Sequence, residues 1–403
     1  MAELPVIDLI TPEFHQNPFK TYKVLREGMP LCQTVDGIYL VTRFDDVQTV
    51  MKRYKTFSSG WATSAVIHPE WVKKRLRRGP FMVETDPPVH TVHRGLIYPH
   101  LAKRKMINLG EQMKEFASEL AERGISENNE FDFLDKFAFP YVVHFSDTAT
   151  GLRSSENLQQ TRDWVELSEN IPVSRPSAAY LREKVQSELR KQNKYFDKMI
   201  QEKRSCPHSD MISTLVQTRI NGKNISRKSL WGALNLFMIS GFEAPGQIIA
   251  TALMLLANNE KINRAVRDDF SLIPNLIEET VRLLSPAQGS FRVTTEEVEL
   301  SGGVIPKGET ILALIGSANR DPSQFEDPDE FRLGRHNMKS HIGWGGGNHL
   351  CIGVALAREE IKAAIEVLLQ RYSKIQCKPW YEQVWFSTAI GWLVRKVPMQ
   401  FSR

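Results

Sequence analysis

Apolar residues recur along most of this chain at the three-to-four residue spacing of amphipathic helices. The spacing predicts helices within about 91–124 and about 158–204, where Lys, Glu, Gln and Arg separate the apolar positions. A helix is also predicted for 45–54, directly after β-branched and aromatic residues at 38–44 that predict a strand. The N-terminal region should therefore combine a small sheet with helices, and helix should dominate the middle of the chain.

The most apolar long helix is predicted between Leu230 and Asn259. Its length would suit a membrane span, but the apolar run is interrupted by Asn235, Glu243, Pro245 and Gln247. A helix that is apolar nearly all round, with a few polar groups, is typical of the centre of a large core. Its single acid, Glu243, is therefore a candidate functional residue.

After Pro286 the pattern changes to short runs that predict strands at 291–295, 298–300 and 310–315. A last long helix is predicted from Cys351 to Tyr372, and short strands should close the chain. No linker, low-complexity tract or repeat divides the sequence. We therefore predict a single domain, residues 1–403, that is mainly α with small β-sheets.

Composition supports a folded protein and restricts its partners. Of the 403 residues, 41% are apolar and 25% are charged, so a large core can form. The net charge of +5 is small for this length and gives little reason to expect a nucleic-acid partner. Five cations form a run that we interpret as a solvated helix face, with an anion-binding site as the alternative: Lys73, Lys74, Arg75, Arg77 and Arg78.

Cysteine usage and the N-terminus indicate a cytoplasmic protein. The four cysteines lack the paired spacing that disulfide scaffolds and zinc sites need: Cys32, Cys206, Cys351 and Cys377. The first residues include acidic side chains and no long apolar stretch, so neither a signal peptide nor a membrane anchor is predicted. We expect a reducing compartment and no membrane partner.

The segment from His341 to Gly353 reads HIGWGGGNHLCIG and is the first candidate site. Glycine-rich loops before helices can bind phosphate, but no Lys-Ser/Thr pair follows these glycines and no strand immediately precedes them, as the known phosphate motifs require. Cys351 stands at the predicted helix start instead, where N–H groups and the helix dipole favour a thiolate, the form that binds iron. A lone cysteine is otherwise most often a small buried apolar residue.

This segment resembles the cysteine-ligand loop of the cytochrome P450 family at six positions: Trp344, Gly345, Gly347, His349, Cys351 and Gly353. The family usually has Phe in place of Trp344, and the change keeps an aromatic ring while adding an indole N–H. The resemblance implies the cytochrome P450 fold, haem b (iron protoporphyrin IX) as the cofactor, and Cys351 as the ligand of its iron. Glycines in the loop would let the backbone lie close to this flat cofactor.

A second segment, IEETVRL at 277–283, supports the resemblance. Glu279 and Arg282 stand at i and i+3 on one helix face. Taken alone, such a pair is an ordinary surface ion pair. In the cytochrome P450 family this E-x-x-R pair is fastened to a downstream loop, which here would be 319–335, with Arg335 at its end. We interpret all three charged residues as structural.

Haem carries two propionates, which need cationic or hydrogen-bonding partners from separate parts of the chain. The resemblance assigns that role to four residues: His90, Arg94, Arg292 and His349. Each of these taken separately would be interpreted as a solvated charge. His341 is expected to pack behind the cysteine loop, and His93 is given no role.

The central helix departs from the family at the oxygen site. It reads SGFEAPG over 240–246, where the family generally has Ala/Gly-Gly-x-Asp/Glu-Thr-Thr. Glu243 matches the acid that helps to relay protons to bound oxygen, but Ala244 and Pro245 replace the threonines. Pro245 can still kink the helix, because it offers no N–H to the carbonyl of Gly241. We hypothesise that water, Glu243 itself or a substrate hydroxyl delivers the protons.

The resemblance thus implies a monooxygenase that oxidises a small, largely hydrophobic substrate, of the kind found in secondary metabolism, with O2 and electrons from a ferredoxin or flavodoxin and its reductase. The alternatives are a peroxide-driven peroxygenase, an oxidative coupling enzyme, and a haem protein without catalysis. Five cations are predicted to dock the redox partner: Lys103, Arg104, Lys105, Lys339 and Arg358. The substrate pocket is expected to involve 60–85, about 165–185, 233–244, 286–291 and 388–393, which includes Trp392.

Overall fold

The computed structural model describes residues 4–9, 11–60, 81–102, 109–125, 129–170, 179–387 and 390–403. Helices make up most of this part of the chain: α1 Pro12–Gln16, α2 Pro18–Gly28, α3 Phe44–Lys52, α6 Val89–Leu101, α8 Gly110–Gly124, α9 Phe139–Thr150, α10 Leu158–Asn170, α11 Ala179–Ser205, α12 Met211–Gln217, α13 Arg227–Phe242, α14 Ala244–Ala257, α15 Glu260–Asp268, α16 Ile273–Leu283, α17 Ile315–Ala318 and α18 Val354–Arg371.

The strands are short, and most lie before residue 60 or after residue 286: β1 Val6–Ile7, β2 Leu31–Thr34, β3 Tyr39–Val41, β4 Phe57–Ser58, β5 Phe131–Asp132, β6 Arg219–Ile220, β7 Lys223–Asn224, β8 Ser290–Thr294, β9 Val298–Leu300, β10 Gly303–Ile305, β11 Thr310–Ala313, β12 Lys374–Cys377, β13 Trp385–Ser387, β14 Trp392–Val394 and β15 Pro398–Ser402. The strands predicted around 40, 293, 299 and 312 are thereby confirmed. The cationic runs at 73–78 and 103–105 lie outside the described residues.

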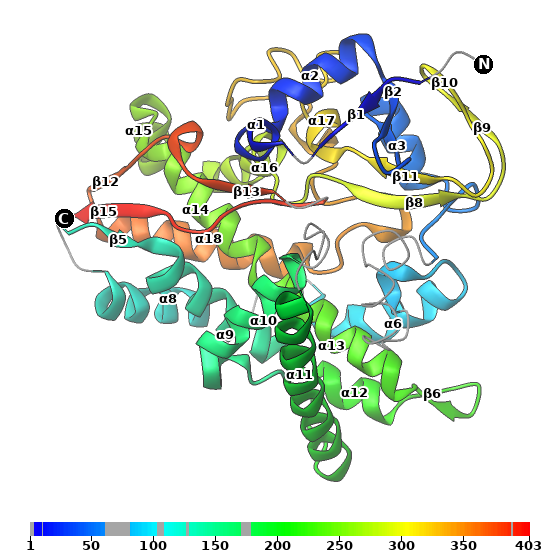
Figure 1. Ribbon diagram of the computed structural model, residues 1–403. Helices are drawn as coiled ribbons and strands as arrows, with labels where there is room; N and C mark the ends of the chain where they lie inside the picture. The colour runs from blue at the N-terminus through cyan, green and yellow to red at the C-terminus, as the bar shows by residue number, and fades with distance from the viewer. Residues whose placement is uncertain are drawn as a thin grey trace.

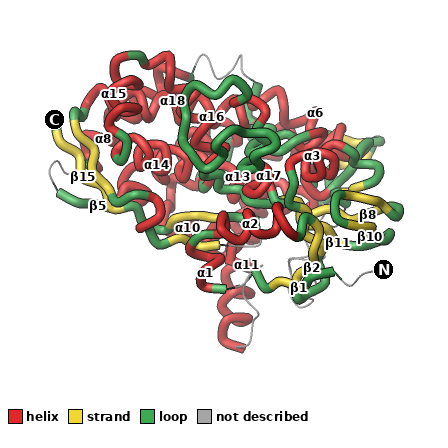
Figure 2. Tube along the Cα trace, turned by 90° about the horizontal axis from the view of Figure 1, so that it is seen from above, coloured by secondary structure: helices red, strands yellow, loops and turns green. Residues whose placement is uncertain are grey.

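The main sheet and most helices occupy different sides of the molecule (Figure 1). The sheet has six strands in the order β1-β2-β3-β11-β8-β4. It joins the N-terminal region to the chain after 286, because β3 pairs in parallel with β11, and β8 pairs antiparallel with β11 and β4. Seen from above in Figure 2, β1, β2, β8, β10 and β11 gather at one end, and α8, α14 and α15 lie toward the other.

The predicted central helix is present but divided in two. α13 ends at Phe242 and α14 begins at Ala244, and nearly all of α14 is buried. By length and composition the stretch Arg227–Ala257 could cross a membrane, yet 67% of its most apolar window is buried inside the protein. α14 packs against α16 and α18, and α13 packs against α9. The pair therefore forms the centre of the helical core, and its division falls at the candidate acid Glu243.

Candidate active site

The glycine-rich loop folds back on itself before α18. The Cys351 N–H donates to the carbonyl of Trp344 at 2.8 Å and closes the loop. Gly345 and Gly347 have φ angles of 79° and 58°, in the left-handed region that favours glycine. A Cβ atom at Gly347 would also clash with the backbone carbonyl of Met51. These glycines are therefore required by the path of the loop.

Cys351 precedes the helix, so the predicted helix start was wrong by three residues: α18 begins at Val354 with Gly353 as its N-cap. The N–H of Ala357 donates to the carbonyl of Gly353, which is the start of the helical hydrogen-bond pattern. Burial raises the pKa of the thiol, although the N–H groups of Gly353 and Val354 and the charges of Arg94 and Arg358 act to lower it. The protein by itself therefore favours the thiol, contrary to the expectation from the helix dipole, and a bound metal ion would have to displace the proton.

Four basic side chains from three separate segments converge beside this loop. His90 and Arg94 lie one turn apart on α6, Arg292 lies on β8, and His349 lies two residues before Cys351. The rings of His90 and His349 are 4.4 Å apart. The Nε2 atoms of both rings are buried and have no hydrogen-bond partner within the described chain. The four residues predicted as propionate partners thus lie close together, and the Nε2 atoms of the two histidines need a hydrogen-bond partner from a ligand or water.

The charges of this cluster are poorly compensated. Burial and the nearby Arg292, His90 and Arg94 lower the pKa of His349 to about 3. Burial also lowers the pKa of Arg292 to about 10, and the charge of Asp86 opposes this shift only in part. The Asp86 carboxylate already accepts the Ser58 hydroxyl and the backbone N–H of Ser59. Crowded cations with unsatisfied ring nitrogens fit a ligand that carries carboxylates. The site therefore suits haem, whose propionates supply two.

Behind the loop, one carboxylate gathers three side chains. Oε2 of Glu278 accepts the indole N–H of Trp344 at 3.0 Å and lies 3.0 Å from Nε2 of His341. Oε1 accepts Nε of Arg358 at 2.7 Å. Burial alone would raise the pKa of Glu278, but the hydrogen bonds from His341 and Arg358 lower it to about 2. His341 lies behind the loop as predicted, whereas Glu278 was missed although it directly precedes Glu279.

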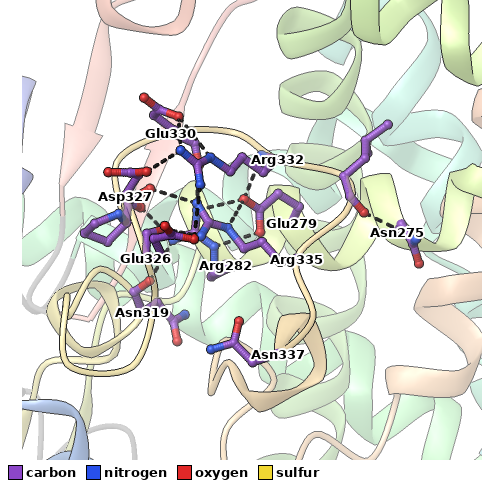
Figure 3. Close-up of polar contacts among 12 residues, drawn as sticks. Asn275, Glu279, Arg282, Asn319, Glu326, Asp327, Glu330, Arg332, Arg335 and Asn337 are labelled. Atoms are coloured by element: carbon purple, nitrogen blue, oxygen red, sulfur yellow. Dashed lines mark hydrogen bonds and ion pairs between the residues drawn. The ribbon is translucent and has the colours of Figure 1, made fainter.

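The E-x-x-R pair is fully buried and holds α16 to the downstream loop (Figure 3). Nε and Nη2 of Arg282 lie 2.7 and 2.8 Å from the two carboxylate oxygens of Glu279. Arg335 adds a second cation, with Nε at 2.7 Å from Oε1. Arg282 also donates to the carbonyls of Asn319 and Pro328. This confirms the prediction that the pair and Arg335 are structural.

The break in the central helix follows from Pro245. Without an N–H at 245, the carbonyl of Gly241 has no donor from its own helix, and Oγ of Ser146 on α9 donates to it at 3.1 Å. A Cβ atom at Gly241 would lie 2.7 Å from that hydroxyl, so the close approach needs glycine. Ser146 was not found from the sequence, because it lies 95 positions away and no local pattern marks it.

Glu243 lines a cavity of about 40 Å³ together with Arg162, Glu166 and Arg395. Burial raises the pKa of Glu243, while the hydrogen bond from Nε2 of Gln247, at 2.6 Å, and the charge of Arg162 oppose that shift. The Glu166 and Arg395 side chains are paired at 3.1 Å and are 45% and 40% exposed. A cavity of this size holds about three waters. The acid is therefore joined to surface charges by a space that can contain water.

The segments predicted for the substrate pocket are described only in part, since 61–80, 171–178 and 388–389 lie outside the described residues. Two of the segments lie side by side, because Gln288 N–H donates to the Ile390 carbonyl at 2.7 Å. Trp392, however, is 1% exposed, and its ring stacks on Trp385 at 3.6 Å. Trp392 is thus a core residue, and its assignment to a pocket was wrong.

The family model for Cytochrome P450 matches residues 8–383. The chain belongs to the cytochrome P450 family. This P450 is 30% identical over 385 residues to Cytochrome P450 107B1 of Saccharopolyspora erythraea, covering 93% of this chain and 92% of the relative. It is 28% identical over 378 residues to the polyketide biosynthesis cytochrome P450 PksS of Bacillus subtilis, covering 90% of each.

Among solved structures, this P450 resembles CYP109Q5 from Chondromyces apiculatus, with a TM-score of 0.84, 28% identity and 98% of both chains covered. The predicted P450 fold is thereby confirmed. Family membership also establishes the coarser part of the functional prediction: the chain is a monooxygenase with haem b as its cofactor. The roles of individual residues remain predictions.

Proposed function

We propose that this P450 oxidises a medium-sized, largely hydrophobic secondary metabolite, using O2 and two electrons from a ferredoxin or flavodoxin and its reductase. A relative named for polyketide biosynthesis supports this class of substrate. A cytoplasmic location is part of the proposal, since the four cysteines are free thiols that a reducing compartment preserves.

The observation that carries the proposal is the gathering of a cysteine and four bases around one place. In this proposal, Cys351 binds the haem iron. The propionates are held by His90, Arg94, Arg292 and His349. Trp344 packs its ring against the ligand loop, and the N–H of Gly353 donates to the sulfur. When bound, haem iron supplies the oxygen and electron chemistry, with the cysteine sulfur donating electron density.

Proton delivery in this proposal begins at Glu243. Burial raises the pKa of its carboxyl group, which favours the protonated acid more than at an exposed glutamate. Water in the adjoining cavity replaces that proton from the surface, past the Glu166–Arg395 pair. Ala244 has no hydroxyl to take part, which agrees with delivery through water or through a hydroxyl of the substrate.

The redox partner is proposed to dock over the cysteine loop. Leu350, directly before Cys351, is 45% exposed, and Lys339 is exposed nearby in the sequence. Arg358 is exposed too, but its charge is shared with Glu278. An apolar contact flanked by cations suits an acidic ferredoxin or flavodoxin.

The deciding experiment is the absorption spectrum of the reduced protein with carbon monoxide. We expect the red-shifted band of thiolate coordination in the wild type and its loss in Cys351→Ala. Retention of the band in that variant would remove the ligand assignment. Screening of metabolites by the spectral shift that follows loss of iron-bound water would then identify substrates.

A peroxygenase is the second candidate, and the missing threonine is the feature that favours it. Turnover of an identified substrate with hydrogen peroxide should be compared with turnover using ferredoxin, ferredoxin reductase and NADPH. We expect the electron-transfer system to be the more efficient. The variant Ala244→Thr should change the yield of product per electron pair, and an unchanged yield on every substrate would contradict the proposed route of protons.

A further inference from the structure

We propose that Ser240 supplies the hydroxyl that position 244 lacks, an inference that rests on the monooxygenase function proposed above. Residues 240 and 244 are four apart, so they lie on the same helix face, one turn from each other. The division of the central helix preserves this relation, because Glu243 keeps right-handed helical angles of φ −90° and ψ −58°. The hydroxyl that the family has at position 244 would therefore lie one helical turn earlier, at Ser240.

The face that carries Ser240 is turned toward the cofactor side of the molecule. Phe237, three residues earlier on that face, contacts Phe81 edge-on with ring centroids 6.4 Å apart. Phe81 in turn stacks on His93 of α6 at 4.3 Å. The same helix α6 carries His90 and Arg94. His93 thus has the packing role of linking the two helices.

Ser240 is exposed even though α13 lies at the centre of the fold. Phe237 and Met238 before it and Phe242 after it are buried. Packing against a neighbouring helix therefore does not cover this position. A small polar side chain that stays accessible at the centre of the core can reach a ligand or water bound there.

The Ser240 hydroxyl also has no hydrogen bond with the rest of the described chain. Hydroxyls inside helices commonly return to the carbonyl four residues earlier. Thr148, Thr150 and Ser205 do so, at 3.0, 2.7 and 3.1 Å. The extra acceptor that Pro245 creates, the carbonyl of Gly241, is taken by Ser146. The Ser240 O–H is consequently available as a donor and its oxygen as an acceptor.

The chemistry of the hydroxyl is that of a relay. The reaction combines R–H, O2, two electrons from the ferredoxin-type donor and two protons to give R–OH and one water. Ser240 donates a hydrogen bond to the reacting oxygen and accepts one from water that Glu243 reprotonates, so the serine itself is unchanged. Without that donor, the same two electrons and two protons leave with O2 as hydrogen peroxide.

The test uses cyanide, because a bound diatomic anion accepts a hydrogen bond and no substrate is needed. We expect Ser240→Ala to weaken cyanide binding to the ferric holoprotein by about three- to tenfold, the value of one hydrogen bond. The double variant Ser240→Ala/Ala244→Thr should recover to within about twofold of the wild type, because a hydroxyl returns to the same face.

The matched control is Ser229→Ala on the same helix. The backbone N–H of residue 229, which donates to Oγ of Ser226, is kept in the variant. We expect its cyanide affinity to equal that of the wild type. Equal affinities in Ser240→Ala and Ser229→Ala, or no recovery in the double variant, would overturn the inference. The carbon monoxide spectrum distinguishes failure of this inference from failure of the proposed function. A normal thiolate band together with unchanged cyanide affinity in Ser240→Ala would remove only the role of Ser240. Absence of the thiolate band in the wild type would remove the proposed function.

Discussion

The cysteine side and the oxygen side of the proposed haem site are built in opposite ways. On the cysteine side, the carboxylates of Glu278 and Glu279 each accept several side-chain N–H groups, and all of these donors except Arg282 are far away in the sequence. On the oxygen side, the central helix is divided, and Glu243 faces a cavity large enough for water. Charge-assisted hydrogen bonds fix geometry, whereas loosely packed polar groups can exchange protons. The comparison indicates a fixed geometry around the proposed metal ligand and a space for water beside the proposed proton donor.

The largest effect should come from breaking the fixed side. Glu279→Gln removes the buried negative charge while Arg282 and Arg335 keep theirs, so we expect a loss of about 3–5 kcal/mol in the free energy of unfolding. Urea unfolding of the holoprotein measures it. The control is Arg332→Gln, whose ion pairs lie at the surface, with an expected loss of at most about 1 kcal/mol. Similar losses of unfolding free energy in both variants would show that the buried ion pair contributes no more to stability than the surface pairs do.

Acid should weaken the same side through Glu278. Because its pKa is about 2 in the fold against 4.5 ordinarily, its contribution to stability is complete above pH 4.5 and disappears as the pH falls toward 2. Glu278→Gln should therefore cost about 2 kcal/mol at pH 7 and progressively less between pH 4.5 and 3. The control Glu260→Gln removes a surface pair and should show no such trend. A pH-independent cost would contradict the assignment.

The division of the central helix gives a sharper test on the oxygen side. Ser146→Ala leaves the Gly241 carbonyl without a donor, at an expected cost of about 1–2 kcal/mol in unfolding free energy. In a Pro245→Ala background the restored N–H can bond that carbonyl, so the same change should cost about 0.5 kcal/mol or less. Equal costs in the two backgrounds would mean that the serine does not compensate for the proline.

The smallest effect should come from Trp344→Phe. The variant keeps a ring against the cysteine loop and removes one of several donors to Glu278, so we expect a loss of about 0.5–1 kcal/mol in thermal or urea unfolding. The carbon monoxide band of the reduced protein should remain. A loss as large as that of Glu279→Gln would show that the indole N–H, and not the ring, holds the loop.

Local chemistry could be predicted from the sequence, and long-range pairing only where the family resemblance supplied it, as for Glu279 and Arg335. The E-x-x-R pair, the cysteine loop and the break at Pro245 each depend on a few neighbouring residues, and all three lie where the pattern indicated. The Ser146–Gly241 and Trp344–Glu278 bonds join residues 95 and 66 positions apart, so only the folded chain reveals them. Cys351 fell outside its predicted helix, because the helical hydrogen-bond pattern begins only at the carbonyl of Gly353.

The crowding of bases next to Cys351 has a consequence for how the enzyme accumulates in a cell. Arg94 and Arg292 are cations in a buried place, where burial already lowers the pKa of each, and a ligand with two carboxylates would compensate their charges. Free energy of cofactor binding is then also free energy of folding. Chains made while porphyrin is scarce should be opened and degraded sooner, so the amount of enzyme follows porphyrin supply as well as gene expression.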